Sequence, residues 1–88
     1  MRNLKYAILG LVNRKPMTGY DIKKVFEDRA LTSFWHAEHS QIYPELKKLV
    51  NEGMIRYDTS VKGEKLKTKL YSITDLGKNE FINWLKDD

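Results

Sequence analysis

The sequence predicts a winged helix-turn-helix, a mainly α fold with a small β-hairpin (α+β) and the order α-α-α-β-β-α. Three observations support this fold class. Three segments with helical periodicity fill most of the chain up to Gly53, two runs with a period of two follow between Met54 and Ile73, and a last helical pattern begins after Thr74. An isolated hairpin is only marginally stable in water. The hairpin is therefore expected to pack its inner part on the helices, so that its outer end projects as a wing.

The first helix is expected from Leu4 to about Asn13, because apolar residues recur there at helical spacing. They are Leu4, Ala7, Ile8, Leu11 and Val12. Pro16 ends the helix, since a proline disfavours helical backbone at the residue before it. The second helix opens at "TGYD", where Thr18 and Asp21 can cap each other's backbone amides as in a capping box. Its buried face is expected to hold Ile22, Val25, Phe26 and Ala30.

The stretch "LTSFWHAEH" breaks the helical period, and we expect a loop whose aromatic residues Phe34 and Trp35 plug the core. The third helix follows, and Gly53 just past its last turn suits a C-cap. Its apolar stripe consists of Ile42, Leu46, Leu49 and Val50.

Pro44 stands inside this third helical pattern, although a proline in a helix interior costs ~3 kcal/mol. With Ser40 as the N-cap, the amides of the first three helical residues have no partner within the helix. Pro44 then removes about one hydrogen bond, at the position where its loss costs least, and it stiffens the helix entry. We therefore expect a first turn that holds a fixed shape against a partner.

Alternation predicts the hairpin. One strand face carries Ile55, Tyr57, Thr59 and Val61, and one face of the next strand carries Lys67, Lys69, Tyr71 and Ile73. "KGEK" is the turn, where Gly63 can take a positive φ. The last helix begins after Thr74 as its N-cap, and Trp84 on its apolar side is expected to lie in the core. The other residues of that side are Leu76, Phe81 and Leu85.

The 88 residues suffice for one small domain, residues 1–88, with one modest core. The chain has no cysteine, which excludes disulfides, thiolate metal sites and cysteine nucleophiles and fits a reducing compartment. Its apolar runs are too short to cross a membrane, and its N-terminus lacks the long apolar stretch of a secretory signal. We therefore expect a cytoplasmic protein.

Positive charge is concentrated on the predicted hairpin. The whole chain has 16 Lys and Arg against 12 Asp and Glu, a net charge of +4. From Met54 to Ile73, five basic residues against two acids leave +3, so most of the excess lies there. Such a stretch indicates an anionic partner such as nucleic acid.

The polar face of the third helix carries side chains that can read DNA bases. Opposite its apolar stripe lie Ser40, Pro44, Lys47, Lys48 and Asn51, flanked by Gln41 and Tyr43, and none of them is acidic. Glutamine can bond the edge of adenine in the major groove, and lysine can bond the acceptors of guanine. Hydroxyls and helix N-termini bind phosphate. Each position also has an ordinary alternative: the lysines on a solvated face, Ser40 as a cap alone, and Tyr43 at the edge of the core.

Four stretches, "LKYAILGLV", "MTGYDIKKVFE", "FWHAEHSQIYPELKKLVNEGMI" and "LYSITDLGKNEFINWL", resemble the N-terminal domain of the PadR family of transcriptional regulators. The resemblance runs from Leu4 to Leu85. It implies a winged helix-turn-helix, a homodimer, and repression through pseudo-palindromic operators in double-stranded DNA. The DNA-contacting positions that it implies are Thr18, Gly19 and Tyr20 at the start of the second helix, Ser40, Gln41, Tyr43, Pro44 and Lys47 on the third, and Lys62, Gly63, Lys65 and Lys67 on the wing.

Proteins of this type usually continue into a C-terminal helical domain that dimerises and can receive a small-molecule effector. The sequence stops where that domain would begin, so the resemblance implies either a DNA-binding domain that lacks it or a chain that dimerises through its first and last helices. Leu9 and Ile82 lie off the core stripes of those helices and are the candidates for such a contact.

Other functions fit the sequence less well. The alternative is a winged-helix module that binds an acidic protein through the basic hairpin. RNA binding is disfavoured because the hairpin lacks adjacent exposed aromatics on which bases could stack. His36 and His39, with Glu38, show no third ligand at a regular spacing, so neither a metal nor another cofactor is expected. No nucleophile–base pair or glycine-rich phosphate loop is evident, so we do not expect an enzyme.

Overall fold

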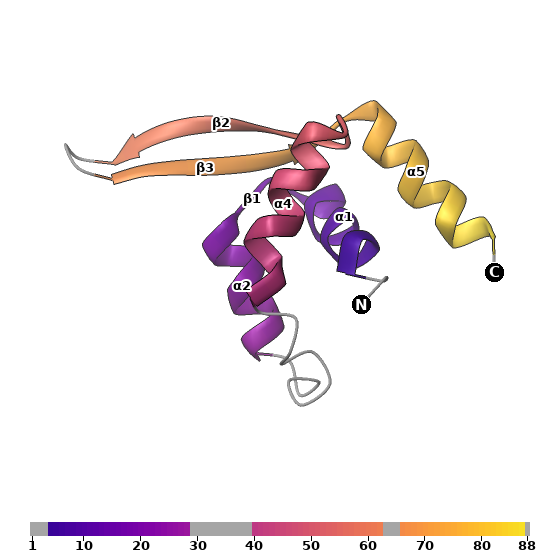
Figure 1. The fold of residues 1–88 in the computed structure, drawn as a ribbon, viewed down its shortest axis with the longest axis horizontal. Coiled ribbons are helices and arrows are strands. Elements are labelled where there is room, and N and C mark those ends of the chain that lie inside the picture. Colours follow the sequence, from indigo (N-terminus) through magenta and orange to yellow (C-terminus); the bar gives the residue numbers. More distant parts are fainter. Residues whose placement is uncertain (1–3, 29–39, 63–65, 88) are drawn as a thin grey trace.

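The computed structural model describes residues 4–28, 40–62 and 66–87. Its elements are α1 (Leu4–Arg14), β1 (Met17–Thr18), α2 (Gly19–Asp28), α4 (Ile42–Asn51), β2 (Ile55–Lys62), β3 (Leu66–Ile73) and α5 (Asp75–Lys86). Figure 1 shows α1, α2 and α4 gathered in the middle, the β2–β3 ribbon projecting to one side and α5 to the other. The predicted winged-helix arrangement is confirmed, with one strand more than expected.

The core is formed where the apolar faces of α1, α2 and α4 meet the inner end of the sheet. Its fully buried members include Ile8, Ile22, Ile42, Leu46, Leu49 and Ile55, and Met17 and Tyr71 close it at the sheet. The stripes predicted for these helices are therefore confirmed at their central positions. Ala30, Phe34 and Trp35, which were also expected in the core, lie outside the described residues.

Leu9 corrects one expectation, because it is fully buried in the core and is not available for a contact with a second copy. The helix α1 contacts α4, α5 and β3, so partners cover more than one of its sides. A single apolar stripe describes a helix that packs on one side only. A helix at the centre of the domain also buries residues beside its stripe, and Leu9 is one of them.

The sheet has three antiparallel strands in the order β1-β3-β2, where the sequence predicted two. The two residues of β1 pair with β3, Met17 with Tyr71 and Thr18 with Leu70. Two residues are too few to show an alternating pattern, so the sequence carries no signal for β1. The extra strand fixes the start of α2 to the inner strand of the wing.

Hydrogen bonds at the helix ends confirm the N-terminal caps predicted for α2 and α5. The Asp21 amide donates to the Thr18 hydroxyl at 3.0 Å, and the Thr18 amide donates to the Asp21 carboxylate at 3.2 Å, which completes the capping box of α2. At α5, the Gly77 amide donates to the Thr74 hydroxyl at 3.0 Å. Each cap satisfies amides that have no partner within the helix.

The end of α4 is a Schellman motif built on Gly53, as the glycine position predicted. Gly53 has a φ of +78°, a backbone conformation that favours glycine. Its amide donates to the Val50 carbonyl at 3.0 Å, and the Met54 amide donates to the Leu49 carbonyl at 3.0 Å. The chain therefore leaves α4 in a fixed direction and enters β2 two residues later.

The junction between β3 and α5 is held against the same turn. The Thr74 amide donates to the Met54 carbonyl at 3.1 Å, and the Thr74 hydroxyl lies 2.6 Å from the Gly53 carbonyl oxygen. Gly77 is buried here, and a Cβ at this position would overlap the Met54 carbonyl oxygen. The close approach of two backbones therefore requires glycine in the first turn of α5.

The apolar side of α5 is less buried than expected. Trp84 was predicted to lie in the core, but its side chain is 39% exposed, and Leu76 and Leu85 are also exposed. Trp84 instead stacks flat on Tyr6 of α1, with ring centroids 4.6 Å apart. Phe81 is the residue of this side that packs against the core. The helix lies at one end of the domain, so only part of its apolar surface meets α1.

A polar cluster joins α1 to α5 beside this stack. The Tyr6 hydroxyl donates to the Glu80 carboxylate at 2.9 Å, and the Lys5 ammonium lies 3.5 Å from the same oxygen. The hydrogen bond from Tyr6, followed by the charge of Lys5, holds the pKa of Glu80 below its ordinary value.

None of the described helices is long and apolar enough to cross a bilayer.

Gly77→Ala should lower the free energy of unfolding by roughly 1–3 kcal/mol, since the added methyl group collides with backbone that cannot step aside. Alanine is the better helix former by about 1 kcal/mol, so an effect of helix propensity alone would have the opposite sign. Urea unfolding of the variant and of Asn79→Ala, an exposed change in the same helix, measures this. A Gly77→Ala protein as stable as the Asn79→Ala control would contradict the close approach.

Tyr6→Phe should reduce the dependence of stability on acid pH. A carboxyl whose pKa is lowered on folding stabilises the protein above its ordinary pKa, and this stabilisation is lost as the pH falls through the folded value. In the unchanged protein, the stabilisation that Glu80 loses on acidification should be under about 1 kcal/mol, because Glu80 is partly exposed to solvent. Carboxyl NMR titration should show the pKa of Glu80 rising toward its ordinary value in the variant. Equal Glu80 titrations in the two proteins would count against the Tyr6 hydrogen bond.

Candidate functional site

One face of α4 is buried and the opposite face is open to solvent. Ile42, Leu46 and Leu49 are almost completely buried. The polar residues predicted to lie opposite them are all exposed: Ser40, Gln41, Tyr43, Pro44, Lys47, Lys48 and Asn51. Tyr43 is 52% exposed, so it is not a core-edge aromatic. The helix therefore presents a surface of hydroxyl, amide and ammonium groups.

The N-terminus of α4 differs from the prediction in one detail. The helix begins at Ile42, its N-cap is Gln41, and no side chain caps it. Ser40 and Gln41 form a short 3₁₀ turn ahead of the helix, so Ser40 is not the N-cap. Pro44 is then the third helical residue, and its position is one of the four whose amides have no partner within the helix. The expectation that Pro44 removes a hydrogen bond is therefore wrong. The proline fits the first turn without the loss of any helical hydrogen bond.

The start of α2 lies against this face of α4. A Cβ on Gly19 would be only 2.7 Å from Cε1 of Tyr43, so the absence of a side chain at Gly19 makes room for the Tyr43 ring. Tyr20, the next residue, is 63% exposed. Two tyrosine hydroxyls from different helices can therefore reach solvent on the same side of the domain.

The middle of the wing adds a lysine that lies over an aromatic ring. The Lys69 ammonium lies 4.6 Å from the centroid of the Tyr57 ring, a cation–π contact. The register pairs Tyr57 with Tyr71 and Thr59 with Lys69, so Lys69 is the diagonal neighbour of Tyr57 on one face of the hairpin. Tyr57 and Tyr71 pack edge to face, 5.8 Å apart.

These elements enclose a groove, here called the tyrosine groove, which consists of two adjoining hollows of about 330 and 420 Å³. Both hollows are lined by Tyr43, Lys69 and Tyr71. The first is also lined by Thr18, Gly19, Tyr20 and Thr68, and the second by Lys47, Val50, Asn51 and Tyr57. Two lysines and no carboxylate belong to the lining among the described residues.

Tyr71 connects the core to this groove. Burial, with smaller contributions from Tyr57 and Tyr43, raises the pKa of the Tyr71 phenol. Tyr71 therefore remains neutral at physiological pH. This phenol therefore adds no negative charge to the groove, and the polar groups of the lining other than the two lysines are hydroxyls and the amide of Asn51.

The structure brings together five of the predicted site residues, Thr18, Gly19, Tyr20, Tyr43 and Lys47, in the tyrosine groove. Ser40, Gln41 and Pro44 lie exposed beside it at the start of α4. Lys62 ends β2 and Lys67 lies on β3, at the outer part of the ribbon. Gly63 and Lys65 lie outside the described residues.

The predicted site omitted Lys69, Tyr57 and Tyr71. Alternation placed Tyr57 on one face of the first strand and Lys69 with Tyr71 on one face of the second strand. The omission arose because the sequence alone does not give the register, which puts Lys69 diagonal to Tyr57 and close to α4 rather than at the wing tip.

No metal centre is evident in the described part of the chain, where no three His, Cys, Asp or Glu side chains come close enough to hold an ion. The stretch with His36 and His39 lies outside that part.

Comparison with known proteins gives the family. The profile of the transcriptional regulator PadR-like family matches residues 8–83, which is most of the chain. This chain belongs to the PadR-like family. Its resemblance to PadR proteins, first seen in four sequence stretches, is thereby confirmed.

One relative and two crystal structures of it illustrate the similarity. The negative transcriptional regulator PadR of Bacillus subtilis is 54% identical over 85 residues, which are 97% of this chain and 46% of that protein. The crystal structure of B. subtilis PadR with operator DNA has a TM-score of 0.83 at 54% identity, over 93% of this chain and 46% of that one. The structure of B. subtilis PadR with p-coumaric acid has a TM-score of 0.75 at 50% identity, over 96% and 42%. The chain thus spans less than half the length of these PadR chains.

Pro44→Ala should leave the free energy of unfolding almost unchanged, because no helical hydrogen bond is gained by restoring the amide. Lys48→Pro, one turn further along α4, is the matched comparison. It should cost ~3 kcal/mol, since it removes an interior hydrogen bond and clashes with the preceding turn. Thermal and urea unfolding measure both changes. A Pro44→Ala protein that is several kcal/mol less stable would mean that α4 begins elsewhere.

Proposed function

We propose that this chain is the DNA-binding domain of a transcriptional repressor, which places α4 in the major groove of double-stranded DNA and lays the wing along the sugar–phosphate backbone. The observation that carries this proposal is the tyrosine groove, which has two lysines and no acid in its lining, beside an α4 face made only of neutral and basic side chains. The similarity to a PadR protein crystallised with operator DNA supports it. The proposed role is binding, without catalysis.

Base reading is assigned to the exposed residues at the start and middle of α4. Gln41 has an amide that can donate to and accept from the edge of adenine, and Lys47 can donate to O6 and N7 of guanine. Both side chains are exposed, and the buried stripe of α4 prevents the helix from turning them away. Pro44 keeps the first turn rigid, so that less conformational freedom is lost when this end of the helix enters the groove.

Phosphate contacts are assigned to the rim around α4. The hydroxyls of Tyr20 and Tyr43 can donate to phosphate oxygens, and Lys69 supplies a charge. A free lysine side chain loses up to ~2 kcal/mol of rotamer entropy when it is fixed. Because Lys69 already lies over the Tyr57 ring, part of this entropy is lost when the protein folds, and less is lost when it binds DNA. The wing residues Lys62, Gly63, Lys65 and Lys67 are proposed to extend these contacts along the backbone.

For the whole protein we propose a homodimer on a pseudo-palindromic operator, acting in the cytoplasm. Two copies would read half-sites about one DNA turn, ~34 Å, apart. Ile82 on α5 is 39% exposed and remains available for contact with a second copy. The longer relatives, one of them crystallised with p-coumaric acid, support a small-molecule effector for the full-length protein.

The rival function is a module that binds an acidic protein, and the basic charge of the wing is what favours it. A mobility-shift assay with a random DNA duplex at low salt distinguishes the two. Nonspecific DNA binding is electrostatic, so a DNA-binding domain shifts the duplex under these conditions. Absence of any shift would favour the protein-binding module.

Lys47→Ala and Lys69→Ala should weaken DNA binding in different ways. Lys47→Ala should reduce affinity for a selected site by roughly 1–3 kcal/mol and relax the sequence preference at one position. Lys69→Ala should weaken binding to all duplexes about equally, and the log–log salt slope should fall by ~0.9 because the variant neutralises one phosphate fewer. Fluorescence anisotropy against selected and random duplexes measures both.

Lys78→Ala is the control for these two variants, because Lys78 is an exposed lysine on α5, outside the tyrosine groove. It removes the same charge and should leave both the affinity and the salt slope close to those of the unchanged protein. If all three variants bound DNA more weakly to the same extent, total charge and not the groove would govern binding, and the assignment of the interface would be wrong.

A further inference from the structure

Gly19 is the first residue of α2, and its own backbone does not require glycine. The positive φ that favours glycine occurs at Gly53 and not at Gly19. Alanine could adopt the same backbone and is the better helix former. Gly19 is also buried and has no side chain, so it offers a partner little surface of its own. The reason for glycine at this position therefore lies in the residues that surround it.

A side chain at Gly19 would overlap the ring of Tyr43. A Cβ there would lie 2.7 Å from Cε1 of that ring, well inside the separation at which two carbon atoms attract each other. The same Cβ would lie 3.5 Å from Cδ1 of Leu46, which is an ordinary contact with the buried face of α4. The overlap therefore involves the Tyr43 ring, and the packing of α4 on the core is left intact.

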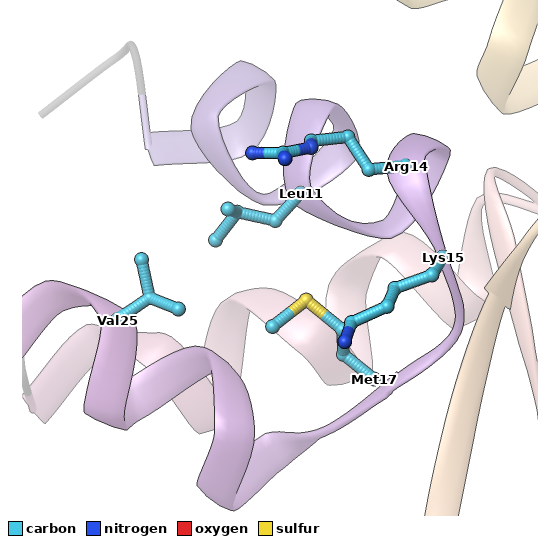
Figure 2. Close-up of a pocket in the computed structure, with 5 residues that line it drawn as sticks. All are labelled: Leu11, Arg14, Lys15, Met17 and Val25. Carbon is cyan, nitrogen blue, oxygen red and sulfur yellow. The ribbon is translucent and has the colours of Figure 1, made fainter.

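The backbone that carries Gly19 is held in place by the residues before it. Thr18 pairs with Leu70 of β3, and its hydroxyl caps α2. Met17 is buried, and Figure 2 shows its side chain directed into the space between α1 and α2. Because this segment is fixed to three elements, the half-exposed ring of Tyr43 is the group that would have to move.

The Tyr43 ring stands where a displacement would change the proposed DNA-binding surface. It lines both hollows of the tyrosine groove, together with Lys69 and Tyr71. A ring pushed away from α2 would enter this space, and its hydroxyl would leave the position from which it can donate to phosphate. A hydroxyl forms a hydrogen bond only when the acceptor lies within about 3 Å, so even a small displacement matters.

We propose that Gly19 is a positioning residue for DNA binding: the missing side chain leaves the space in which the Tyr43 ring lies, and this contact sets where the Tyr43 hydroxyl meets the sugar–phosphate backbone. The inference rests on the proposed function. It assigns to Gly19 a role that acts through Tyr43, and it predicts that the two positions are coupled in DNA affinity.

Gly19→Ala should bind a random DNA duplex about tenfold more weakly than the unchanged protein, the loss expected for one hydrogen bond to a charged group. Fluorescence anisotropy at one low salt concentration measures this. Gly10→Ala is the matched control, because a Cβ there would also press on an aromatic ring, 3.1 Å from Cζ of Phe81, but outside the tyrosine groove. The control should bind the duplex as tightly as the unchanged protein.

The Tyr43→Ala background separates a role through Tyr43 from a direct contact. Without the ring there is nothing to displace, so Gly19→Ala/Tyr43→Ala should bind the duplex as Tyr43→Ala does. NMR gives an independent measurement. A nuclear Overhauser effect between the Tyr43 ring and the Gly19 Hα protons is expected in the unchanged protein, and the ring resonances of Tyr43 should shift in Gly19→Ala.

An unchanged protein that bound no duplex would refute the proposed function and this inference with it. If the unchanged protein binds, three results would overturn the inference alone: full affinity in Gly19→Ala, an equal loss in Gly10→Ala, or a further loss when Gly19→Ala is added to Tyr43→Ala. Amide spectra report whether each variant is folded. If Gly19→Ala alone did not fold, a folded double variant that binds as Tyr43→Ala does would support the inference, and an unfolded double variant would overturn it.

Discussion

The pairing of β1 with β3 determines where the exposed groups of this domain lie. Met17 pairs with Tyr71, and β3 also forms the long ladder with β2. One strand therefore fixes both the start of α2 and the inner half of the wing. Because α4 packs against both α2 and β2, its polar face is held between them. Neither the two-residue strand nor the hairpin would be stable alone.

In this arrangement, some buried residues also line or support the exposed groove. Tyr71 is buried in the core yet lines both hollows of the tyrosine groove, and Gly19 is buried beneath the exposed Tyr43. A change in core packing at these positions would therefore move groups on the surface. At the opposite end of the domain, α5 contacts α1 and β3 and is held to the turn that carries Gly53, but it lines neither hollow of the tyrosine groove.

Periodicity and capping chemistry were enough to predict the helices, the buried stripe of α4, the starts of α2 and α5 and the C-terminal end of α4, because these depend on neighbours within one turn. What the sequence could not give depends on contacts distant in the chain. The strand β1 has no pattern of its own, Leu9 is buried because several elements surround α1, and Lys69 is positioned by a register set across the hairpin. Ser40 failed as a cap because a 3₁₀ turn precedes the helix, which begins only at Ile42.

Contacts between residues distant in the chain fix the groove residues from the inside. This explains how these residues can be held in position and still be exposed. An exposed lysine usually gains little from a surface contact, because ordering the side chain offsets the electrostatic gain. At Lys69 the ordering partner is an aromatic ring that is itself packed on a buried tyrosine, so the order comes from the fold. Likewise, Pro44 and the Schellman turn fix the two ends of α4 without using its polar side chains. The groups that face outward therefore keep their hydrogen-bonding capacity for a partner, while their positions are set by residues that face inward.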